Sequence, residues 1–328
     1  MFFKNTALFK TSLAVSFLLL FGITTLVVLL KPLDLDKPFI LEINKGKGLN
    51  QVIEVLSKKR IIKRPLILKI YSRIFFKGDI YAGEYLLASD LNFLKILKKL
   101  SIGDIYYRQI RLSEGSAIKD IFNLLKKNPS LSCDDEQLNQ ERITDDLSIP
   151  YFYLEGLFYP DTYNFRKGDS CFSILQRSYK NHNLLVKELW ESRKTGLPYK
   201  NPYEALILAS LIEKEGIEKK QIAGVFIRRL QLKMKLQSDP TIIFALGDNY
   251  GGDIKRSHIK MKHPYNTYYI KGLPPSPIGL VSRSSLEAAL NPMESSFLYF
   301  VSKGDGTHFF SSTLEEHNMA VQKYQLNK

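Results

Sequence analysis

Two carboxylates stand at the end of a long apolar segment, where they could act as acids or bases. The eight residues 205–212 are apolar or small apart from Ser210, and Glu213 and Glu215 follow directly before Gly216. An apolar stretch of this kind predicts a buried helix. A carboxylate in the last turn of a helix opposes the helix dipole, and burial disfavours its ionised form, so both effects raise its pKa. A general acid at neutral pH needs such a raised pKa.

The spacing of the two carboxylates leaves their roles open. Residues two apart point about 200° apart around a helix, so Glu213 and Glu215 cannot share one site. The residues alone barely separate Glu213 from Glu215 as the candidate acid. The alternative is that both are solvated side chains beyond the end of a buried helix.

Two other regions combine aromatic rings with polar groups, as carbohydrate sites do. Residues 154–163 place Glu155 and Asp161 around an aromatic run, although a packed turn would look similar. Residues 236–292 are rich in Gly, Pro, Asn and Tyr, which predicts long ordered loops with short strands. Long ordered loops on a rigid body often carry binding and catalysis.

Other chemistries lack their motifs. The chain has no Gly-rich nucleotide loop, no H-E-x-x-H and no G-x-S-x-G. The five histidines show no metal-ligand spacing, so no metal and no cofactor is expected; His308 and His317 are interpreted as structural or groove-lining. Cys133 and Cys171 could pair in an oxidising compartment, but no spacing rule decides this.

The N-terminus predicts a membrane anchor. Residues 11–30 carry no charge and are bounded by Lys10 and Lys31. Twenty helical residues span roughly 30 Å, the hydrocarbon thickness of a bilayer. A cleaved signal peptide would have a shorter apolar region and a small-x-small site, neither of which is present. We therefore expect a single uncleaved transmembrane helix.

The charge pattern predicts the topology. Residues 1–10 carry Lys4 and Lys10 without an acid, which keeps this stub in the cytoplasm and places the rest in the periplasm, anchored to the inner membrane. Nucleic acid is therefore not expected as the partner of the net charge of +14. Residues 31–128 hold 20 basic and 10 acidic residues, against 25 and 23 in residues 129–328. The excess lies beside the membrane, where anionic lipid headgroups would attract it.

The periodicity of the remaining chain predicts an α+β fold in two parts. A linker over 31–38 leads to a small β-α-α-β domain over 39–107, with strands at 39–43 and 81–85, helices at 49–59 and 65–75, and a following helix at 92–100. A mixed α/β domain with long ordered loops occupies 108–328. Its expected elements are strands at 106–112 and 298–301, helices at 117–127, 172–193, 203–215, 219–233 and 314–326, and an irregular insertion at 128–150.

Motifs along nearly the whole chain resemble those of the endolytic murein transglycosylases, the YceG-like family of membrane-anchored peptidoglycan lyases. They occur in the family's order, at residues 81–85, 114–115, 154–163, 209–215, 236–241, 265–268, 272–275, 291–292, 299–301 and 308–310. Gly216 departs from the pattern, because members often carry Thr or Ala there. The β-α-α-β unit is similar to the family's LysM-like module, a fold associated with glycan binding.

The resemblance implies cleavage of the β-1,4 bond between N-acetylmuramic acid and N-acetylglucosamine in nascent glycan strands. The products would carry 1,6-anhydro-muramyl ends, and the cleavage would limit strand elongation. The family's catalytic glutamate falls at Glu215. Our candidates for contacting the sugar are Glu155, Gln237, Asp239 and Asn266 through hydrogen bonds, and Tyr265 and Tyr268 through ring stacking.

Peptidoglycan strands are the expected substrate, and penicillin-binding proteins and other cell-wall synthases are candidate partners. Two other functions stay open. One is a hydrolase of the same bond with Asp161 or Asp239 as a second carboxylate, since hydrolases usually need two. The other is a non-catalytic glycan-binding scaffold of the cell-wall synthesis machinery.

Overall fold

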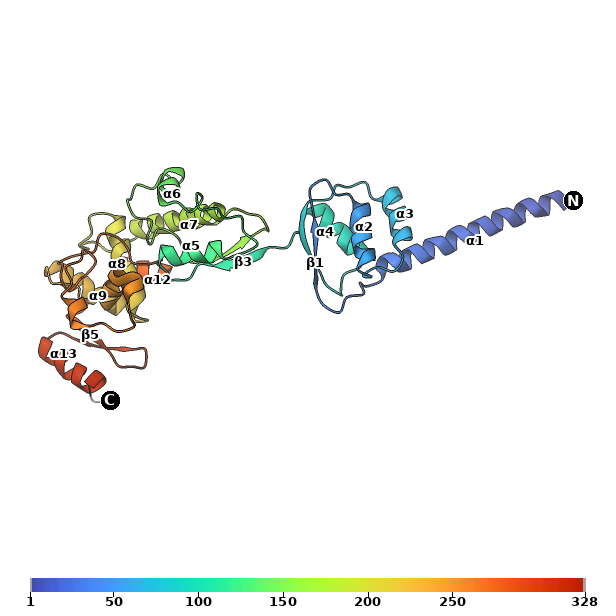
Figure 1. Ribbon diagram of the computed structural model, residues 1–328. Helices are drawn as coiled ribbons and strands as arrows, with labels where there is room; N and C mark the ends of the chain where they lie inside the picture. The colour runs from blue at the N-terminus through green and yellow to red at the C-terminus, as the bar shows by residue number, and fades with distance from the viewer. Residues whose placement is uncertain (1, 327–328) are drawn as a thin grey trace. The chain divides into compact units, whose positions relative to one another are not determined.

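The computed structural model describes residues 2–326, with side chains from residue 9 onward, in two compact units (Figure 1). The first unit comprises the chain up to Arg108 together with Asn164–Lys167, and the second comprises Gln109–Tyr163 and Gly168–Lys328. This division falls next to the boundary at 107/108 expected from the sequence. Each unit has its own elements and is described by itself.

The first unit contains the predicted β-α-α-β order. Strands β1 (Phe39–Ile43) and β2 (Gly83–Leu87) pair antiparallel, with Phe39 opposite Leu87 and Ile43 opposite Gly83. Helices α2 (Leu49–Lys58) and α3 (Pro65–Phe75) lie between them in the chain, and α4 (Phe93–Ile102) follows. Strand β2 begins two residues later than expected. The buried core joins both strands to α2 and α4 through Leu41, Val52, Leu56, Tyr85, Ile96 and Leu100.

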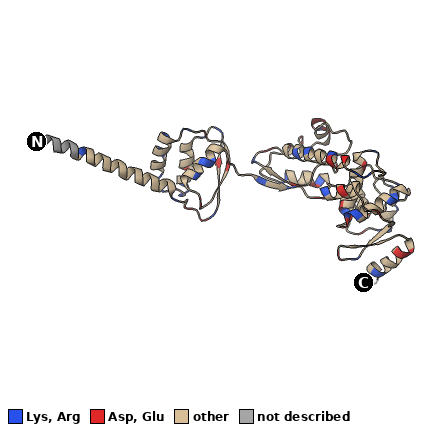
Figure 2. Cartoon of the chain, turned by 180° about the vertical axis from the view of Figure 1, so that it is seen from behind, with Lys and Arg blue, Asp and Glu red and all other residues tan. Residues whose placement is uncertain are grey.

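Helix α1 (Phe2–Leu30) is apolar and largely exposed along its described side chains. Its segment Phe9–Leu30 has a mean hydropathy of 2.7, so its length and composition suit a membrane span. Residues 11–30 carry no charge, and most of α1 is accordingly tan in Figure 2. The helix includes residues 2–10 of the predicted stub, and the Lys4 side chain is not among those that the structure describes.

The second unit is built around helix α8 (Pro202–Glu215), which packs against α9 (Lys219–Gln231) and α12 (Arg283–Leu290). The Asn201 side chain accepts a hydrogen bond from the Glu204 N–H and caps the first turn of α8. Residues 205–212 are all buried, as their apolar sequence predicts. This burial fixes the position of the last turn, where the two carboxylates lie.

The remaining elements of the chain belong to the second unit, except that β3 and β4 each have residues in both units. They are β3 (Arg108–Arg111), α5 (Ile118–Lys126), α6 (Gln140–Asp146), β4 (Thr162–Phe165), α7 (Cys171–Glu191), α10 (Asp239–Leu246), the 3-10 turn η1 (Gly247–Asn249), α11 (Arg256–Ile259), β5 (Tyr299–Ser302), β6 (His308–Ser311), α13 (Leu314–Val321) and the π-helical turn η2 (Gln322–Leu326). Strand β3 pairs with β4, and β5 pairs antiparallel with β6.

Three expectations about this unit are corrected. Residues 236–292 contain helices and no described strand. The first of these helices, α10, has Pro240 in its first turn, where the missing N–H costs little. The insertion at 128–150 contains α6, and the closing helix changes to π-helical geometry at Gln322. Strand β6 was not expected from the sequence.

A disulfide joins Cys133 to Cys171, with their Cα atoms 5.2 Å apart. The bond joins the insertion to the first residue of α7. The sequence alone did not decide whether these two cysteines pair. Among the described residues no cluster of three or more His, Cys, Asp or Glu side chains has metal-binding geometry.

Candidate active site

A cavity of about 790 Å³ opens at the C-terminal end of α8, beside Glu215. Its walls come from α8, α9, the loop before α10, the β5–β6 hairpin and α13. The lining residues that carry polar or aromatic groups are Glu215, Arg229, Gln237, Asp239, Tyr268, Tyr299, Phe300, Ser302, His308, His317, Asn318 and Gln325.

Glu215 is half-buried and held by one hydroxyl group. The Ser238 hydroxyl donates a hydrogen bond of 2.5 Å to Oε1 of Glu215. Burial raises the pKa of Glu215 to about 7; the Ser238 hydrogen bond opposes this rise and the negative charge of Asp239 adds to it. The carboxyl group is therefore partly protonated at neutral pH, as a general acid requires.

Glu213 lies on the same helix in a different environment. It accepts hydrogen bonds from the Ser282 N–H and hydroxyl, and it forms an ion pair of 3.0 Å with Lys219. Burial alone would raise its pKa, but these partners bring the pKa of Glu213 below its ordinary value. Glu213 is thus an ionised structural group, and Glu215 is the carboxyl that faces the cavity.

Three of the predicted sugar-binding residues lie in the same cavity as Glu215. Gln237, Asp239 and Tyr268 all line it, and the Tyr268 hydroxyl donates a hydrogen bond of 2.6 Å to Oδ1 of Asp239. Gln237 has a φ of 54°, in the left-handed region that non-glycine residues rarely adopt. Backbone geometry of this kind recurs at functional sites.

Arg229 supports the loop that carries these residues. The residue is 6% exposed. Its guanidinium donates to the carbonyl oxygens of Leu298 at 2.6 Å and Leu236 at 2.7 Å, and to Oε1 of Gln237 at 3.3 Å. These bonds join α9 to the loop before α10 and to the start of β5. The same cation lowers the pKa of Glu215 slightly against the larger effect of burial.

Glu155 lies outside this cavity lining and has a structural contact instead. It is 7% exposed, and its Oε1 accepts the Ile118 N–H at the first residue of α5, where Ala117 offers no capping side chain. Burial raises the pKa of Glu155 to about 7. The next residue, Gly156, has a φ of 75°, and a Cβ there would lie 2.4 Å from Cβ of Pro277.

Tyr265 and Asn266 also lie outside the lining residues. The Tyr265 hydroxyl is 2.5 Å from that of Ser276 in the buried core. Asn266 is fully buried, and its amide nitrogen donates to the carbonyl oxygens of Ile259 and Met261 at 3.0 and 2.8 Å. Both side chains hold the 258–276 loops in place, so their positions lend no support to direct sugar contact.

The sequence did not single out the contacts around His308. Its backbone N–H and its ring Nδ1 lie 2.6 and 2.9 Å from Oε2 of Glu218. A Cβ on Gly216 would lie 2.7 Å from Cε1 of His308, so the glycine gives the imidazole room beside the end of α8. The backbone of Gly216 is extended (φ 161°), and α8 ends at Glu215. His308 and His317 both line the cavity, in agreement with the groove-lining interpretation.

Fold and site thus define a two-unit α+β protein with a protonatable carboxyl in a polar and aromatic cavity. The chain belongs to the YceG-like family, whose model matches residues 41–323. This confirms the resemblance seen in the sequence motifs.

Relatives of the chain carry the name endolytic murein transglycosylase. A Bacillus subtilis protein named endolytic murein transglycosylase is 33% identical over 323 residues, which cover 92% of this chain and 89% of that protein. A Streptococcus pneumoniae protein of the same name is 26% identical, and the chain spans 62% of its length. The crystal structure of a putative YceG-like protein from Listeria monocytogenes matches with a TM-score of 0.53 and 29% identity, covering 87% of this chain and 99% of that one.

Proposed function

We propose that this chain is an endolytic murein transglycosylase, a lyase that cleaves the β-1,4 bond between N-acetylmuramic acid and N-acetylglucosamine in nascent glycan strands. The family membership and the name of the Bacillus subtilis relative support this activity. The observation within the chain that carries it is Glu215, a carboxyl with a pKa of about 7 in a large polar and aromatic cavity.

In the proposed mechanism one carboxyl acts twice. Protonated Glu215 donates its proton to the glycosidic oxygen as the bond from that oxygen to C1 of the muramic residue breaks. The C6 hydroxyl of the same residue then attacks C1, and the Glu215 carboxylate takes the hydroxyl proton. A C6–O–C1 bond replaces the broken bond, Glu215 is protonated again, and no water is consumed. Because the attack is intramolecular, its entropic cost is small.

Neighbouring residues would orient the acid and the sugar. Ser238 holds one oxygen of Glu215, so the other oxygen is left for the substrate. Gln237 and Asp239 are the proposed partners of sugar hydroxyl and N-acetyl groups, and Tyr268 is the proposed stacking ring. Arg229 acts as a positioning residue, because it contacts the backbone that carries Gln237.

The variant Glu215→Gln tests this proposal, because it keeps the shape of the side chain and removes the acid. We expect the purified variant to release at least 1,000-fold less anhydro-ended glycan than the parent, on the order of the larger losses seen when an acid–base group is removed. Glu213→Gln is the matched control on the same helix. Anhydro-ended products at parental rates from the Glu215 variant would exclude the assignment.

A muramidase-type hydrolase is the second candidate, because Asp239 lies in the same cavity as Glu215. Mass spectrometry of the products distinguishes the two reactions, since a hydrolysed end is heavier by one water than an anhydro end. An inactive parent protein that still binds glycan would instead favour a scaffold.

We also propose an inner-membrane location with a cytoplasmic N-terminus and both units in the periplasm. The length and hydropathy of α1 support the anchor, and the β-α-α-β unit would serve as a LysM-like glycan-binding module. Cell-wall synthases, including penicillin-binding proteins, are the proposed protein partners. Carbonate extraction should leave the full chain in the membrane and release a chain that lacks residues 1–30; release of the full chain would rule out the anchor.

A further inference from the structure

Helix α3 has apolar side chains on two faces. One face contributes Leu68 to the core of the first unit. The other exposes Leu66, Ile70 and Ile74, whose exposed fractions are 71%, 38% and 56%. These three residues are four apart, so they form one stripe along the helix. We call Leu66, Ile70 and Ile74 the α3 stripe.

The α3 stripe belongs to the same compact unit as α1. Leu29, in the last turn of α1, is buried in one cluster with Leu68 of α3 and with Phe93 and Leu97 of α4. In Figures 1 and 2, α3 lies on the side of the unit from which α1 projects. A bilayer that surrounds α1 would therefore lie next to α3.

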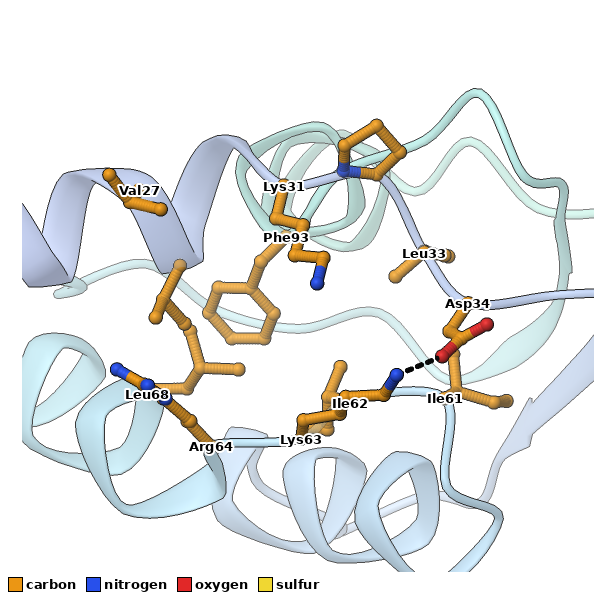
Figure 3. A pocket seen from close by; sticks show the side chains of 12 residues that line it. Val27, Lys31, Leu33, Asp34, Ile61, Ile62, Lys63, Arg64, Leu68 and Phe93 are labelled. Carbon is orange, nitrogen blue, oxygen red and sulfur yellow. Dashed lines mark ion pairs between the residues drawn. The ribbon is translucent and has the colours of Figure 1, made fainter.

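A pocket of about 300 Å³ lies between the end of α1 and the start of α3 (Figure 3). Its apolar walls include Val27, Ile62 and Phe93. The cations that line it are Lys31, Lys63 and Arg64. Lys63 pairs with Asp34 at 2.6 Å, whereas no ion pair is described for Lys31 or Arg64 within residues 9–326.

We propose that the α3 stripe and this pocket form a docking surface for the outer leaflet of the membrane. The stripe would enter the boundary between headgroups and acyl chains, while Lys31 and Arg64 would contact the phosphates of anionic phospholipids. The inference rests on the proposed anchor, because only a spanning α1 brings the surface to the bilayer.

Two features of the unit favour lipid as the occupant. Val27 of α1 is 60% exposed and lines the pocket, so the pocket opens beside the exposed apolar surface of α1. An amphipathic helix with apolar and basic residues is the usual form of a segment that lies in the membrane interface. The pocket also carries an excess of cations over its one carboxylate, which complements anionic headgroups.

Tryptophan quenching by lipids with brominated acyl chains tests the apolar contact. In the full chain, Trp190 is replaced by Phe and one new tryptophan is introduced. The new tryptophan is Leu66→Trp in the stripe, Leu86→Trp at the exposed position of β2, or Val15→Trp in α1. In vesicles of brominated phosphatidylcholine and phosphatidylglycerol, we expect Val15→Trp and Leu66→Trp both to be quenched and Leu86→Trp to be unaffected.

The three positions separate the docking surface from the anchor. Quenching at position 15 without quenching at position 66 would overturn the docking surface and leave the anchor intact. Absence of quenching at both would overturn both proposals. Ile74→Trp provides a second reporter in the stripe if Leu66→Trp does not fold.

The headgroup contact has its own variant, Lys31→Gln combined with Arg64→Gln. For the Leu66→Trp chain, we expect phosphatidylglycerol to increase quenching over phosphatidylcholine alone, and the double variant to lose that increase. The control variant, Lys180→Gln with Lys187→Gln, removes the same amount of charge from α7 and should keep the increase in quenching. An increase that survives in the Lys31 and Arg64 variant would overturn the role of these two cations.

Discussion

At the scale of single residues, the environment of a carboxyl group decides its chemistry. Glu213 and Glu215 lie two positions apart on one helix and have pKa shifts of opposite sign. Ser282 and Lys219 stabilise the charge on Glu213, whereas the Ser238 hydroxyl and the Arg229 cation do not offset the effect of burial on Glu215. When the environments of two titratable groups move their pKa values in opposite directions, the group with the raised pKa is the candidate acid.

Changing Ser238 to Ala tests how Glu215 is tuned. The hydroxyl stabilises the carboxylate, so its loss should raise the pKa of Glu215 above about 7. The activity of the parent should fall as pH rises through about 7, because the acid loses its proton. In the variant this alkaline limb should move up by about one pH unit, since a hydrogen bond to a charged group contributes about 1.5 kcal/mol.

The pH profile of product release measures this shift. Ser284→Ala, which removes a hydroxyl near Glu213 and Lys219, is the control and should leave the limb unchanged. A limb that stays in place in the Ser238 variant would mean that another group controls the pH dependence.

At the scale of elements, the cavity depends on side chains that hold loops to helices. Glu155 caps α5, Asn266 holds the 258–261 turn, and Arg229 joins α9 to the loop before α10. None of these bonds lies within one helix or strand. The motif at 154–163 therefore acts in this structure as a packed corner beside α5.

Replacing Glu155 with Gln should change how stability depends on pH. The folded-state pKa of about 7 exceeds the ordinary value of 4.5, so the folded chain keeps this proton to higher pH than the unfolded chain. The resulting stability is present below about pH 4.5 and is lost as pH rises through about 7. This loss is at most about 3 kcal/mol for Glu155.

Denaturant unfolding between about pH 5 and pH 8 measures this effect. The Gln variant keeps a carbonyl acceptor for the Ile118 N–H. Its stability should fall less than that of the parent as pH rises, and the remaining fall comes from Glu215, whose pKa is also raised. Equal falls in the parent and the variant would contradict the assignment of a raised pKa to Glu155.

At the scale of the whole molecule, charge and cross-linking differ along the chain. The excess of basic residues lies between 31 and 128, next to the helix that suits a membrane span. The disulfide lies in the second unit, and both described cysteines take part in it. An oxidising periplasm would allow such a bond to persist.

The disulfide should stabilise the second unit. It joins residues 38 apart in sequence, and closing a loop of that size stabilises a protein by about 3–4 kcal/mol in the chain-entropy model. The double change Cys133→Ala with Cys171→Ala should therefore lower the unfolding midpoint of the detergent-solubilised chain. A reductant should lower the parent's midpoint and leave the variant's unchanged; a parent that does not respond to reductant would contradict a stabilising bond.

Sequence alone determined the features that depend on neighbouring residues. The uncharged run at 11–30, the apolar run at 205–212 and the β-α-α-β order each follow from local periodicity, and the structure confirms the corresponding helices and strands. Family motifs pointed to Glu215 as the acid. The helix α10 was missed because Asp239-Pro240 can begin either a turn or a helix, and only packing selects between them.

Only the tertiary structure decided which side chains meet. The bond from Ser238 to Glu215 spans 23 residues and that from Ile118 to Glu155 spans 37. The aromatic and polar motifs at 154–163 and 265–268 looked alike in sequence, yet Tyr268 lines the cavity while Glu155, Tyr265 and Asn266 hold the surrounding loops. The residue type shows that a side chain is able to form hydrogen bonds or to stack. Long-range packing determines whether its polar atoms face a cavity or form hydrogen bonds with buried backbone groups.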